Sequence, residues 1–275
     1  MGLVDSHAHL TAPELRGQVA DVLARCSQAG VETVITVGTD LADSKAALSL
    51  AVQYPGRVCA AVGVHPHEAG KVGNAELVAV SRLWERPEVV AVGEIGLDYH
   101  YDFCEREKQQ WVFARQLELA SDLDRPIIIH AREALDDVIS LLLEKGYKQR
   151  RVVFHCFSGT RESASRIAEH GWRVSFTGMI TFRQSSELKQ IAKSCPSYKL
   201  MIETDSPYLS PEPVRNRRPN EPALLIHTVR FLADLRGVPY DTLVKQTAHN
   251  TRMFFDIPGP PGSTNEQLGN GLTDK

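Results

Sequence analysis

The stretch around which this chain is organised lies at its start and reads Leu3-Val4-Asp5-Ser6-His7-Ala8-His9. Its apolar beginning predicts a short buried strand. Because residues two apart in a strand point to the same face, His7 and His9 should aim their imidazoles in one direction. Neutral imidazole is a common ligand for zinc, iron and nickel. The stretch therefore predicts a strand whose end presents two ligands to one metal ion.

The rest of the chain alternates between apolar strands and helices. We expect further strands at residues 31–38, 57–65, 89–98, 126–130, 151–155, within 172–182 and at 199–205. We expect helices at residues 13–30, 41–54, 75–84, 106–123, 134–145, 161–170, 186–195, 222–236 and 240–255. Apolar strands separated by helices are typical of a parallel sheet buried on both faces. The pattern predicts an α/β fold, the closed (β/α)8 or TIM barrel, with a doubly wound open sheet as the alternative.

Length and composition agree with a barrel of this kind. The chain has 275 residues, of which 43% are hydrophobic and 24% charged, and a barrel takes about 250 residues. We expect the barrel domain at residues 1–257 and a disordered tail at 258–275, which is rich in proline, glycine and polar residues. The net charge of −3 gives no general attraction to polyanions, so a nucleic-acid site would have to be a local basic patch.

The sequence indicates an intracellular protein. It contains no apolar run of the ~20 residues that a membrane span needs and no secretory signal pattern. Five scattered cysteines form no C-x-x-C pair, which favours a reducing compartment, either the cytoplasm or the nucleus. One of them, Cys156, follows His155, and by strand alternation we expect it to pack in the core.

Ionisable side chains stand at the carboxyl ends of several predicted strands: His7, His9, His65, Glu94, Asp98, His130, His155, Glu203 and Asp205. In a (β/α)8 barrel these ends surround one mouth, where active sites lie. A single polar residue there has an ordinary explanation, because every strand must end in a loop. A set of histidines and acids at matching ends of different strands predicts a metal site.

Six of these residues form the predicted ligand set, namely His7, His9, Glu94, His130, His155 and Asp205. One ion with an open position needs only three or four ligands, so this set suits two divalent ions with Glu94 between them. We expect His7, His9 and Asp205 to complete one site and His130 and His155 the other. Two ions about 3.5–4 Å apart can clamp the attacking and leaving oxygens of a displacement at phosphorus. The ligand types fit Mg, Mn, Zn, Fe or Ni, and Asp205 could act as general base beside the Glu94 bridge.

Seven short motifs in order resemble the signatures of the TatD family, metal-dependent deoxyribonucleases of the amidohydrolase-like barrel superfamily, with eukaryotic members as the nearest likeness. They are His7-Ala8-His9, Gly63-Val64-His65-Pro66, Gly93-Glu94-Ile95-Gly96-Leu97-Asp98-Tyr99, Ile129-His130-Ala131-Arg132, His155-Cys156-Phe157-Ser158-Gly159, Glu203-Thr204-Asp205-Ser206-Pro207 and Asn220-Glu221-Pro222. The likeness runs from about residue 3 to 255. It implies two divalent ions, hydrolysis of DNA phosphodiesters, commonly from the 3′ end, and the same six ligands. His65 and Glu203 also match family motif positions, and we expect them to contact substrate or to support the ligands.

Two further features favour a phosphodiester substrate. Many amide-hydrolysing relatives in the superfamily carry a carboxylated lysine where this chain has Glu94. The predicted mouth loops also hold arginines, which suit phosphate: Arg132, Arg161, Arg183, Arg215, Arg217 and Arg218. We assign phosphate contacts to Arg217 and Arg218, which follow the last strand, although Pro219 departs from the family pattern there and a solvated basic loop is the alternative. Four aromatic residues near the mouth could stack on bases or pack in the core: Tyr99, Tyr101, Phe103 and Phe157.

The sequence thus predicts a divalent-metal-dependent hydrolase of ester bonds. Its expected action is 3′–5′ exonuclease cleavage of single-stranded DNA or DNA 3′ ends, by a monomer with no membrane and no obligate protein partner. The alternatives are a metal-dependent hydrolase of a small phosphoester or amide, and a non-catalytic binding protein built on a retained barrel. The intact ligand set disfavours the last of these.

Overall fold

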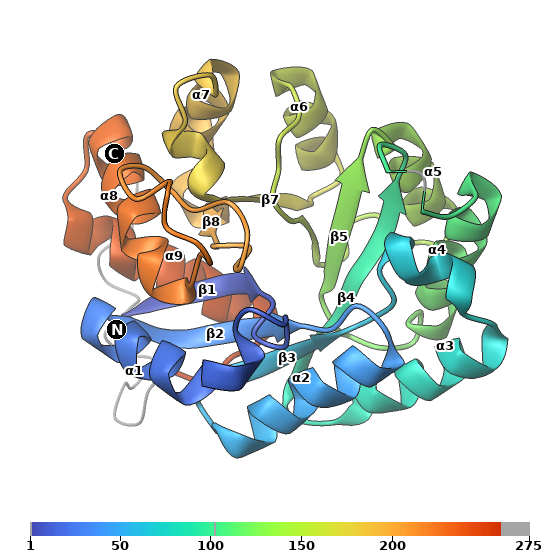
Figure 1. The fold of residues 1–275 in the computed structure, drawn as a ribbon. Helices are drawn as coiled ribbons and strands as arrows, with labels where there is room; N and C mark the ends of the chain where they lie inside the picture. The colour runs from blue at the N-terminus through green and yellow to red at the C-terminus, as the bar shows by residue number, and fades with distance from the viewer. Residues whose placement is uncertain (1, 102, 260–275) are drawn as a thin grey trace.

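The structure is a computed structural model that describes residues 2–101 and 103–259. Its parallel strands follow one another around the sheet in chain order, as Figure 1 shows. They are β1 (Leu3–Ala8), β2 (Val31–Val37), β3 (Val58–Val62), β4 (Val89–Asp98), β5 (Ile127–Arg132), β6 (Val152–Phe154), β7 (Arg173–Phe176) and β8 (Met201–Ile202). A parallel bridge between Ala8 and Ser206 joins the segment after β8 to the end of β1 and so closes the barrel. The barrel prediction is confirmed, and the open sheet was the wrong alternative.

Helices cover the outside of the sheet. They are α1 (Val19–Ala29), α2 (Leu41–Gln53), α3 (Asn74–Ser81), α4 (Arg106–Leu119), α5 (Leu135–Glu144), α6 (Arg161–Glu169), α7 (Ser186–Ser194), α8 (Leu225–Arg236) and α9 (Tyr240–Phe255). Gly30 ends α1 as predicted, in the left-handed conformation at φ 77°, which glycine adopts without steric cost. None of the helices in these described residues is long and apolar enough to cross a bilayer.

Several predicted boundaries differ from those of the structure, and two of the differences bear on the site. The helix expected from residue 13 begins only at Val19, after a short 3-10 turn at Arg16–Gln18, and the glycine at position 17 lowers helix propensity there. The strand expected at 199–205 has only two paired residues, Met201 and Ile202. Beyond them the backbone turns toward β1, where the Asp205 amide donates to the His7 carbonyl at 3.0 Å.

Strand β4 is the longest strand and all of its residues are buried. It lies beside β5 in a register that pairs Gly96 with His130. A Cβ added at Gly96, whose φ is 144°, would lie 2.0 Å from the His130 carbonyl oxygen. Only glycine permits this approach, which brings the end of β4 and the end of β5 together at the mouth of the barrel.

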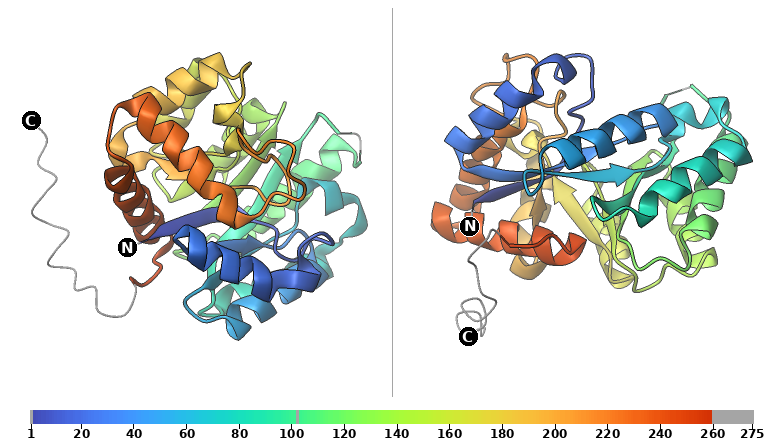
Figure 2. Two further views of the ribbon diagram at one scale, coloured as in Figure 1. Left: turned by 60° about the vertical axis from the view of Figure 1, so that its left-hand side comes forward. Right: turned by 90° about the horizontal axis from the view of Figure 1, so that it is seen from below.

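The two ends of the described chain lie side by side. Helix α9 packs against β1, and Figure 2 shows this last helix next to the amino terminus. Most of the predicted tail, residues 260–275, lies outside the described residues.

Candidate metal centre

A cavity of about 1080 Å³ opens at the carboxyl ends of the strands. Five of the six predicted ligands line it, and the sixth, His7, lies fully buried at its base. The strands deliver these residues as the sequence predicted, because every parallel strand ends at the same mouth.

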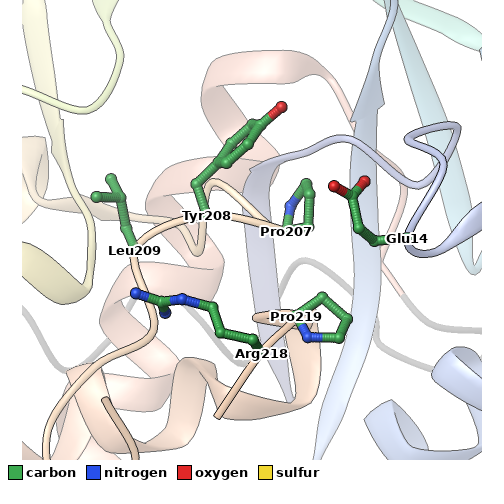
Figure 3. A pocket seen from close by; sticks show the side chains of 6 residues that line it. All are labelled: Glu14, Pro207, Tyr208, Leu209, Arg218 and Pro219. Atoms are coloured by element: carbon green, nitrogen blue, oxygen red, sulfur yellow. The ribbon is translucent and has the colours of Figure 1, made fainter. Parts of the chain in front are cut away.

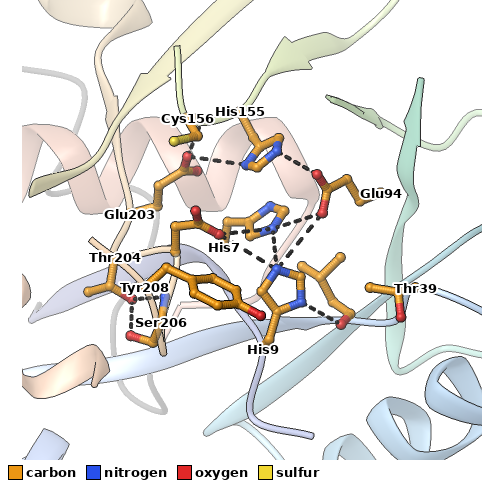
Figure 4. A network of polar contacts seen from close by, with 12 residues as sticks. His7, His9, Thr39, Glu94, His155, Cys156, Glu203, Thr204, Ser206 and Tyr208 are labelled. Atoms are coloured by element: carbon orange, nitrogen blue, oxygen red, sulfur yellow. Dashed lines mark hydrogen bonds and ion pairs between the residues drawn. The ribbon is translucent and has the colours of Figure 1, made fainter. Parts of the chain in front are cut away.

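The first group of ligand atoms comes from β1, β4 and the turn after β8 (Figure 4). His7 Nε2 lies 3.3 Å from His9 Nε2 and 3.3 Å from Glu94 Oε2. Asp205 Oδ1 lies 3.6 Å from His9 Nε2 and 3.9 Å from His7 Nε2. Ligand atoms bound at about 2.1 Å to a tetrahedral ion lie about 3.4 Å apart. The spacing of these four atoms therefore fits one divalent ion.

The second group uses the other oxygen of the same glutamate. Glu94 Oε1 lies 2.7 Å from His130 Nδ1 and 2.5 Å from His155 Nε2, and these two nitrogens are 3.3 Å apart. Each oxygen of Glu94 thus faces a different pair of histidines. This is the arrangement expected of a carboxylate that lies between two ions.

The donor chemistry of the cluster fits cations. His7 Nε2, His9 Nε2 and one oxygen each of Glu94 and Asp205 converge on one point, and the two carboxylates contribute only lone pairs. The far nitrogen of His9 is already engaged, because Nδ1 lies 3.3 Å from the Val37 carbonyl and donates to it. A divalent cation would satisfy all of the facing lone pairs at once, so the residues present can hold the metal that the cluster implies.

Electrostatics at the site follow from burial and from the interleaved charges. Burial alone would raise the pKa of Glu94, but His155, His65 and the other nearby histidines hold it well below its usual range. Burial lowers the pKa of His65 to about 4 and also lowers that of His7. These two imidazoles are therefore neutral at neutral pH.

His65 lies at the second group without being one of its ligands. Its Nδ1 accepts a hydrogen bond of 3.1 Å from the His67 amide, so the proton of the neutral ring sits on Nε2. That Nε2 lies 3.5 Å from Glu94 Oε1 and 3.3 Å from His130 Nδ1. His65 thus offers a neutral N–H donor beside the second group.

Asp98 orients the second group from behind. Its Oδ2 lies 2.9 Å from His130 Nε2 and 2.9 Å from His67 Nε2, so His130 is left with Nδ1 facing Glu94. A carboxylate behind a metal-bound histidine fixes its ring and raises its basicity. The sequence placed Asp98 at the mouth but gave it no role, and His67 was missed, although its two-residue spacing from His65 repeats that of His7 and His9.

Glu203 plays a comparable part behind His155. It is buried, accepts hydrogen bonds from the Cys156 amide at 2.5 Å and the Ser6 hydroxyl at 3.1 Å, and lies 3.7 Å from His155 Nδ1. Of the two roles that the sequence left open for Glu203, this placement favours support of a ligand.

The prediction that Cys156 packs in the core was wrong. Cys156 lines the cavity, and its φ of 47° breaks the extended backbone directly after His155. Strand alternation therefore does not apply at this position. Asp205 has a similar backbone, with φ 55°, which points its carboxylate back into the first group.

Three arginines line two neighbouring cavities. Arg132 lines the metal cavity as predicted, and Arg16 does so as well; Arg16 was missed because we expected it inside a helix. Arg218 lines an adjoining pocket of about 520 Å³ that shares Tyr208 with the metal cavity (Figure 3). Arg217 Nη2 pairs with Glu221 at 2.6 Å, on the loop that follows β8.

The predicted aromatic residues also divide. Tyr101 and Phe103 line the cavity, whereas Phe157 is buried in the core and the Tyr99 hydroxyl donates to Asp137 at 2.6 Å. Tyr208, which the sequence gave no signal for, lines the cavity on the side of the first group, with its ring centre 6.2 Å from that of His9.

Comparisons with known proteins agree with this geometry. Residues 4–256 match the family described as TatD related DNase. The chain is 37% identical over 259 residues to the 3′-5′ ssDNA/RNA exonuclease TatD of Erwinia tasmaniensis, covering 93% of this chain and 100% of the relative. It is 34% identical over 255 residues to an uncharacterized metal-dependent hydrolase, YabD, of Bacillus subtilis, covering 93% and 99%.

Solved structures give the same result. The crystal structure of a TatD homologue from Escherichia coli K12 superposes with a TM-score of 0.87 at 32% identity, covering 93% of this chain and 98% of the other. The ligand geometry, the family match and the likeness to these relatives point to one conclusion. This chain belongs to the TatD family and is a metal-dependent hydrolase.

Proposed function

We propose that this hydrolase is a nuclease that removes nucleotides from the 3′ end of single-stranded DNA or RNA, using two divalent ions. The observation that carries the proposal is that the two oxygens of Glu94 face two separate histidine groups at the base of an open cavity. The relative from Erwinia tasmaniensis, named as an exonuclease of this polarity, supports the choice of substrate.

We assign the ions to residues as follows. His7, His9, Glu94 and Asp205 would hold one ion, and Glu94, His130 and His155 the other. When bound, the ions would supply Lewis-acid stabilisation of charge on the phosphoryl oxygens and acidify a water. Mg, Mn and Zn all accept such ligands, and the share of imidazole favours zinc.

The protein's own groups would then bind, orient and move protons. Asp205 is placed to accept the proton of the attacking water, since burial alone would raise its pKa but His9 and the other histidines lower it, so that it is a carboxylate at neutral pH. As the water oxygen bonds to phosphorus, the P–O3′ bond breaks, and the proton held on Asp205 passes to the released 3′ oxygen. The products are a nucleoside 5′-phosphate and a shortened strand.

Three cavity residues suit the phosphate. His65 Nε2–H, Arg16 and Arg132 face the space beside the ligands, and each can donate to phosphate oxygens. The rest of the strand would continue toward the adjoining pocket, where Arg218 lies. There Arg218 would contact a phosphate remote from the bond that breaks, while the neighbouring Arg217 is held by its pair with Glu221.

The test is cleavage of a 5′-labelled single-stranded oligonucleotide by metal-loaded protein. We expect a ladder of shortened labelled products, absent in the Glu94→Ala variant and after chelation. An intact oligonucleotide, from protein shown to hold its metal, would overturn the proposal. It would favour the second candidate, hydrolysis of a small phosphoester or amide, which is in keeping with YabD, named only as a metal-dependent hydrolase.

We further propose that the protein acts as a monomer in the cytoplasm or nucleus. Its described cysteines are Cys26, Cys59, Cys104, Cys156 and Cys195, and all are free thiols, which supports a reducing compartment. Analytical ultracentrifugation of the metal-loaded protein would test the oligomeric state, and a dimer at micromolar concentration would overturn this part of the proposal.

A further inference from the structure

Exposed aromatic side chains gather at the metal cavity. Among the described residues, the large hydrophobic side chains exposed by more than a third are few: Val52, Tyr101, Phe103, Trp111, Leu143, Tyr198, Tyr208 and Met253. Three of them, Tyr101, Phe103 and Tyr208, line this one cavity. Single exposed apolar residues need no explanation, but several aromatic rings around one polar site indicate a binding surface.

Tyr101 and Phe103 form a stacked pair. Their ring centres are 5.5 Å apart with the planes inclined by 26°. Phe103 is 65% exposed and Tyr101 is 41% exposed, so neither ring is used to fill the core. The His67 ring meets Phe103 edge-on, with centres 4.7 Å apart, and the Arg132 guanidinium lies 4.8 Å from the centre of the Tyr101 ring.

The pair is tied to the second ligand group. Asp98 Oδ1 accepts a hydrogen bond of 3.0 Å from the Tyr101 amide, while its Oδ2 accepts one from His130 Nε2. One buried carboxylate therefore holds both the aromatic pair and a metal ligand. This connection fixes the rings relative to the place where the scissile phosphate would bind.

Tyr208 lies on the side of the first ligand group. Its ring approaches His9 at 65°, with centres 6.2 Å apart (Figure 4), and is 55% exposed. The cavity thus carries aromatic rings on the side of each ligand group. Tyr208 lies next to His9. The Tyr101–Phe103 pair packs on His67, which in turn lies next to His130.

We propose that these rings are base-stacking surfaces, which hold the two bases that flank the scissile phosphate of a single-stranded end. The inference rests on the nuclease function proposed above. Aromatic side chains stack on any base, because every base has a π face. Bases of a duplex are already paired and stacked, so only a single strand or a frayed end can use the rings, and the rings thereby select single strands.

The test compares oligonucleotides that differ only in one base. Metal-loaded protein is given 5′-labelled single strands that carry either a base or an abasic residue at the terminal or the adjacent position. Wild type should cleave the base-bearing strands with a kcat/KM about tenfold higher, within the range for one stacked base. Phe103→Leu and Tyr208→Leu keep apolar bulk but remove the ring. Each should abolish this preference at one position, chiefly through KM, and leave cleavage of the corresponding abasic strand within about twofold of wild type.

Tyr198→Leu is the matched control. Tyr198 is 63% exposed, about as much as Phe103, and lies in the 3-10 turn before β8, at the other end of the barrel. It should retain the full preference for bases. Equal losses on base-bearing and abasic strands, or an unchanged preference in both ring variants, would overturn the stacking role. Equal cleavage of the two kinds of strand by wild type would overturn it as well, while no cleavage of either would overturn the nuclease function itself.

Discussion

Asp98 and His130 are joined by a 2.9 Å contact between Oδ2 and Nε2, and this contact decides which nitrogen of His130 faces the site. Because Nε2 is occupied, Nδ1 is directed to Glu94 at 2.7 Å. Asp98 itself is fully buried and is fixed in turn by Gln109, whose Oε1 accepts its amide proton at 2.9 Å. The second ligand group is therefore built from a chain of buried contacts that begins outside the site.

Removing the charge of Asp98 should weaken binding of one ion selectively. We expect Asp98→Asn to reduce affinity for the ion at the second group by about 10- to 100-fold, as for other partners of metal-bound histidines, and to leave the first group unchanged. Calorimetric titration of metal-free protein with zinc or manganese would measure both sites. Asp124→Asn, at a position 99% exposed, is the control, and equal weakening of both sites would contradict the prediction.

Glu94→Gln should remove the bridge while keeping the shape of the side chain. Glu94 is 2% exposed and is the only residue among the described ones that contacts both ligand groups through its two oxygens. We expect at least a hundredfold loss of turnover, on the order of the loss when a key electrostatic group is removed. Turnover with saturating metal is the measurement, and a variant that keeps wild-type kcat would rule out a bridging role.

Gly96→Ala should destabilise the barrel at the site. The added Cβ would lie 2.0 Å from the His130 carbonyl oxygen, so β4 and β5 would have to separate. We expect a loss of about 1–3 kcal/mol or more, the usual cost of overpacking, together with weaker metal binding. Thermal and urea unfolding measure the first effect. Gly17→Ala, where a Cβ meets nothing within 4 Å, should be nearly neutral, and equal stability of the two variants would contradict the argument.

Stabilisation by metal should increase with pH. Burial alone would lower the pKa of His155, but Glu94 and Glu203 raise it well above its usual value in the metal-free site. A protonated His155 stabilises the metal-free protein below pH about 6.5, and this contribution is lost as pH rises through the higher folded pKa. Because an ion must displace that proton, its affinity rises over the same range. We therefore expect the rise in Tm on adding metal, relative to chelated protein, to be larger at pH 8 than at pH 6. An equal rise at both values would show that His155 is neutral without metal.

The arginines should differ in what they add to the salt dependence of DNA binding. We expect Arg16→Gln and Arg132→Gln each to reduce the slope of log K against log salt by about 1, the amount for one phosphate contact. Arg217→Gln with Arg218→Gln should reduce it by about 1 in total, since Arg217 is already paired with Glu221. Fluorescence anisotropy on the Glu94→Gln protein, which leaves the DNA intact, gives the slopes. Lys148→Gln, before β6 at the opposite end of the barrel, should not change these slopes. If the arginine variants also keep the wild-type slope, the arginines are solvated and do not contact phosphate.

The fold and the gathering of the candidate ligands at one mouth were predictable because both depend on alternation along the chain. Apolar strands followed by helices predict the parallel barrel, and the barrel sends every strand end to one mouth. The sequence alone therefore assigns His7 and His9 at the end of β1, Glu94 on β4 and His130 on β5 to one place. Most of the expected tail lies outside the described residues, so the disorder expected at residues 258–275 stays a prediction.

The supporting contacts could not be read in the same way. The position of Asp98 behind His130 depends on the register between β4 and β5, which is irregular between Val92 and Ile95. Cys156 turns into the cavity through a positive φ, which a periodic pattern does not reveal. Arg16 reaches the cavity because residues before Val19 leave the helix that their sequence suggested.

The contact between β1 and the end of β8, which closes the barrel, means that the two ligand groups form at different points during folding. His7 and Asp205 meet through a 3.0 Å backbone hydrogen bond, although nearly the whole barrel separates them along the chain. The first ligand group therefore cannot assemble until the last strand has been synthesised and has reached the first. An ion bound there would hold these two strands together and stabilise the closed barrel. The second group takes its ligands from β4, β5 and the end of β6, and none of these ligands lies beyond His155 in the chain. A nascent chain can bring these ligands together while the barrel is still open, so the two ligand groups form at different stages of folding.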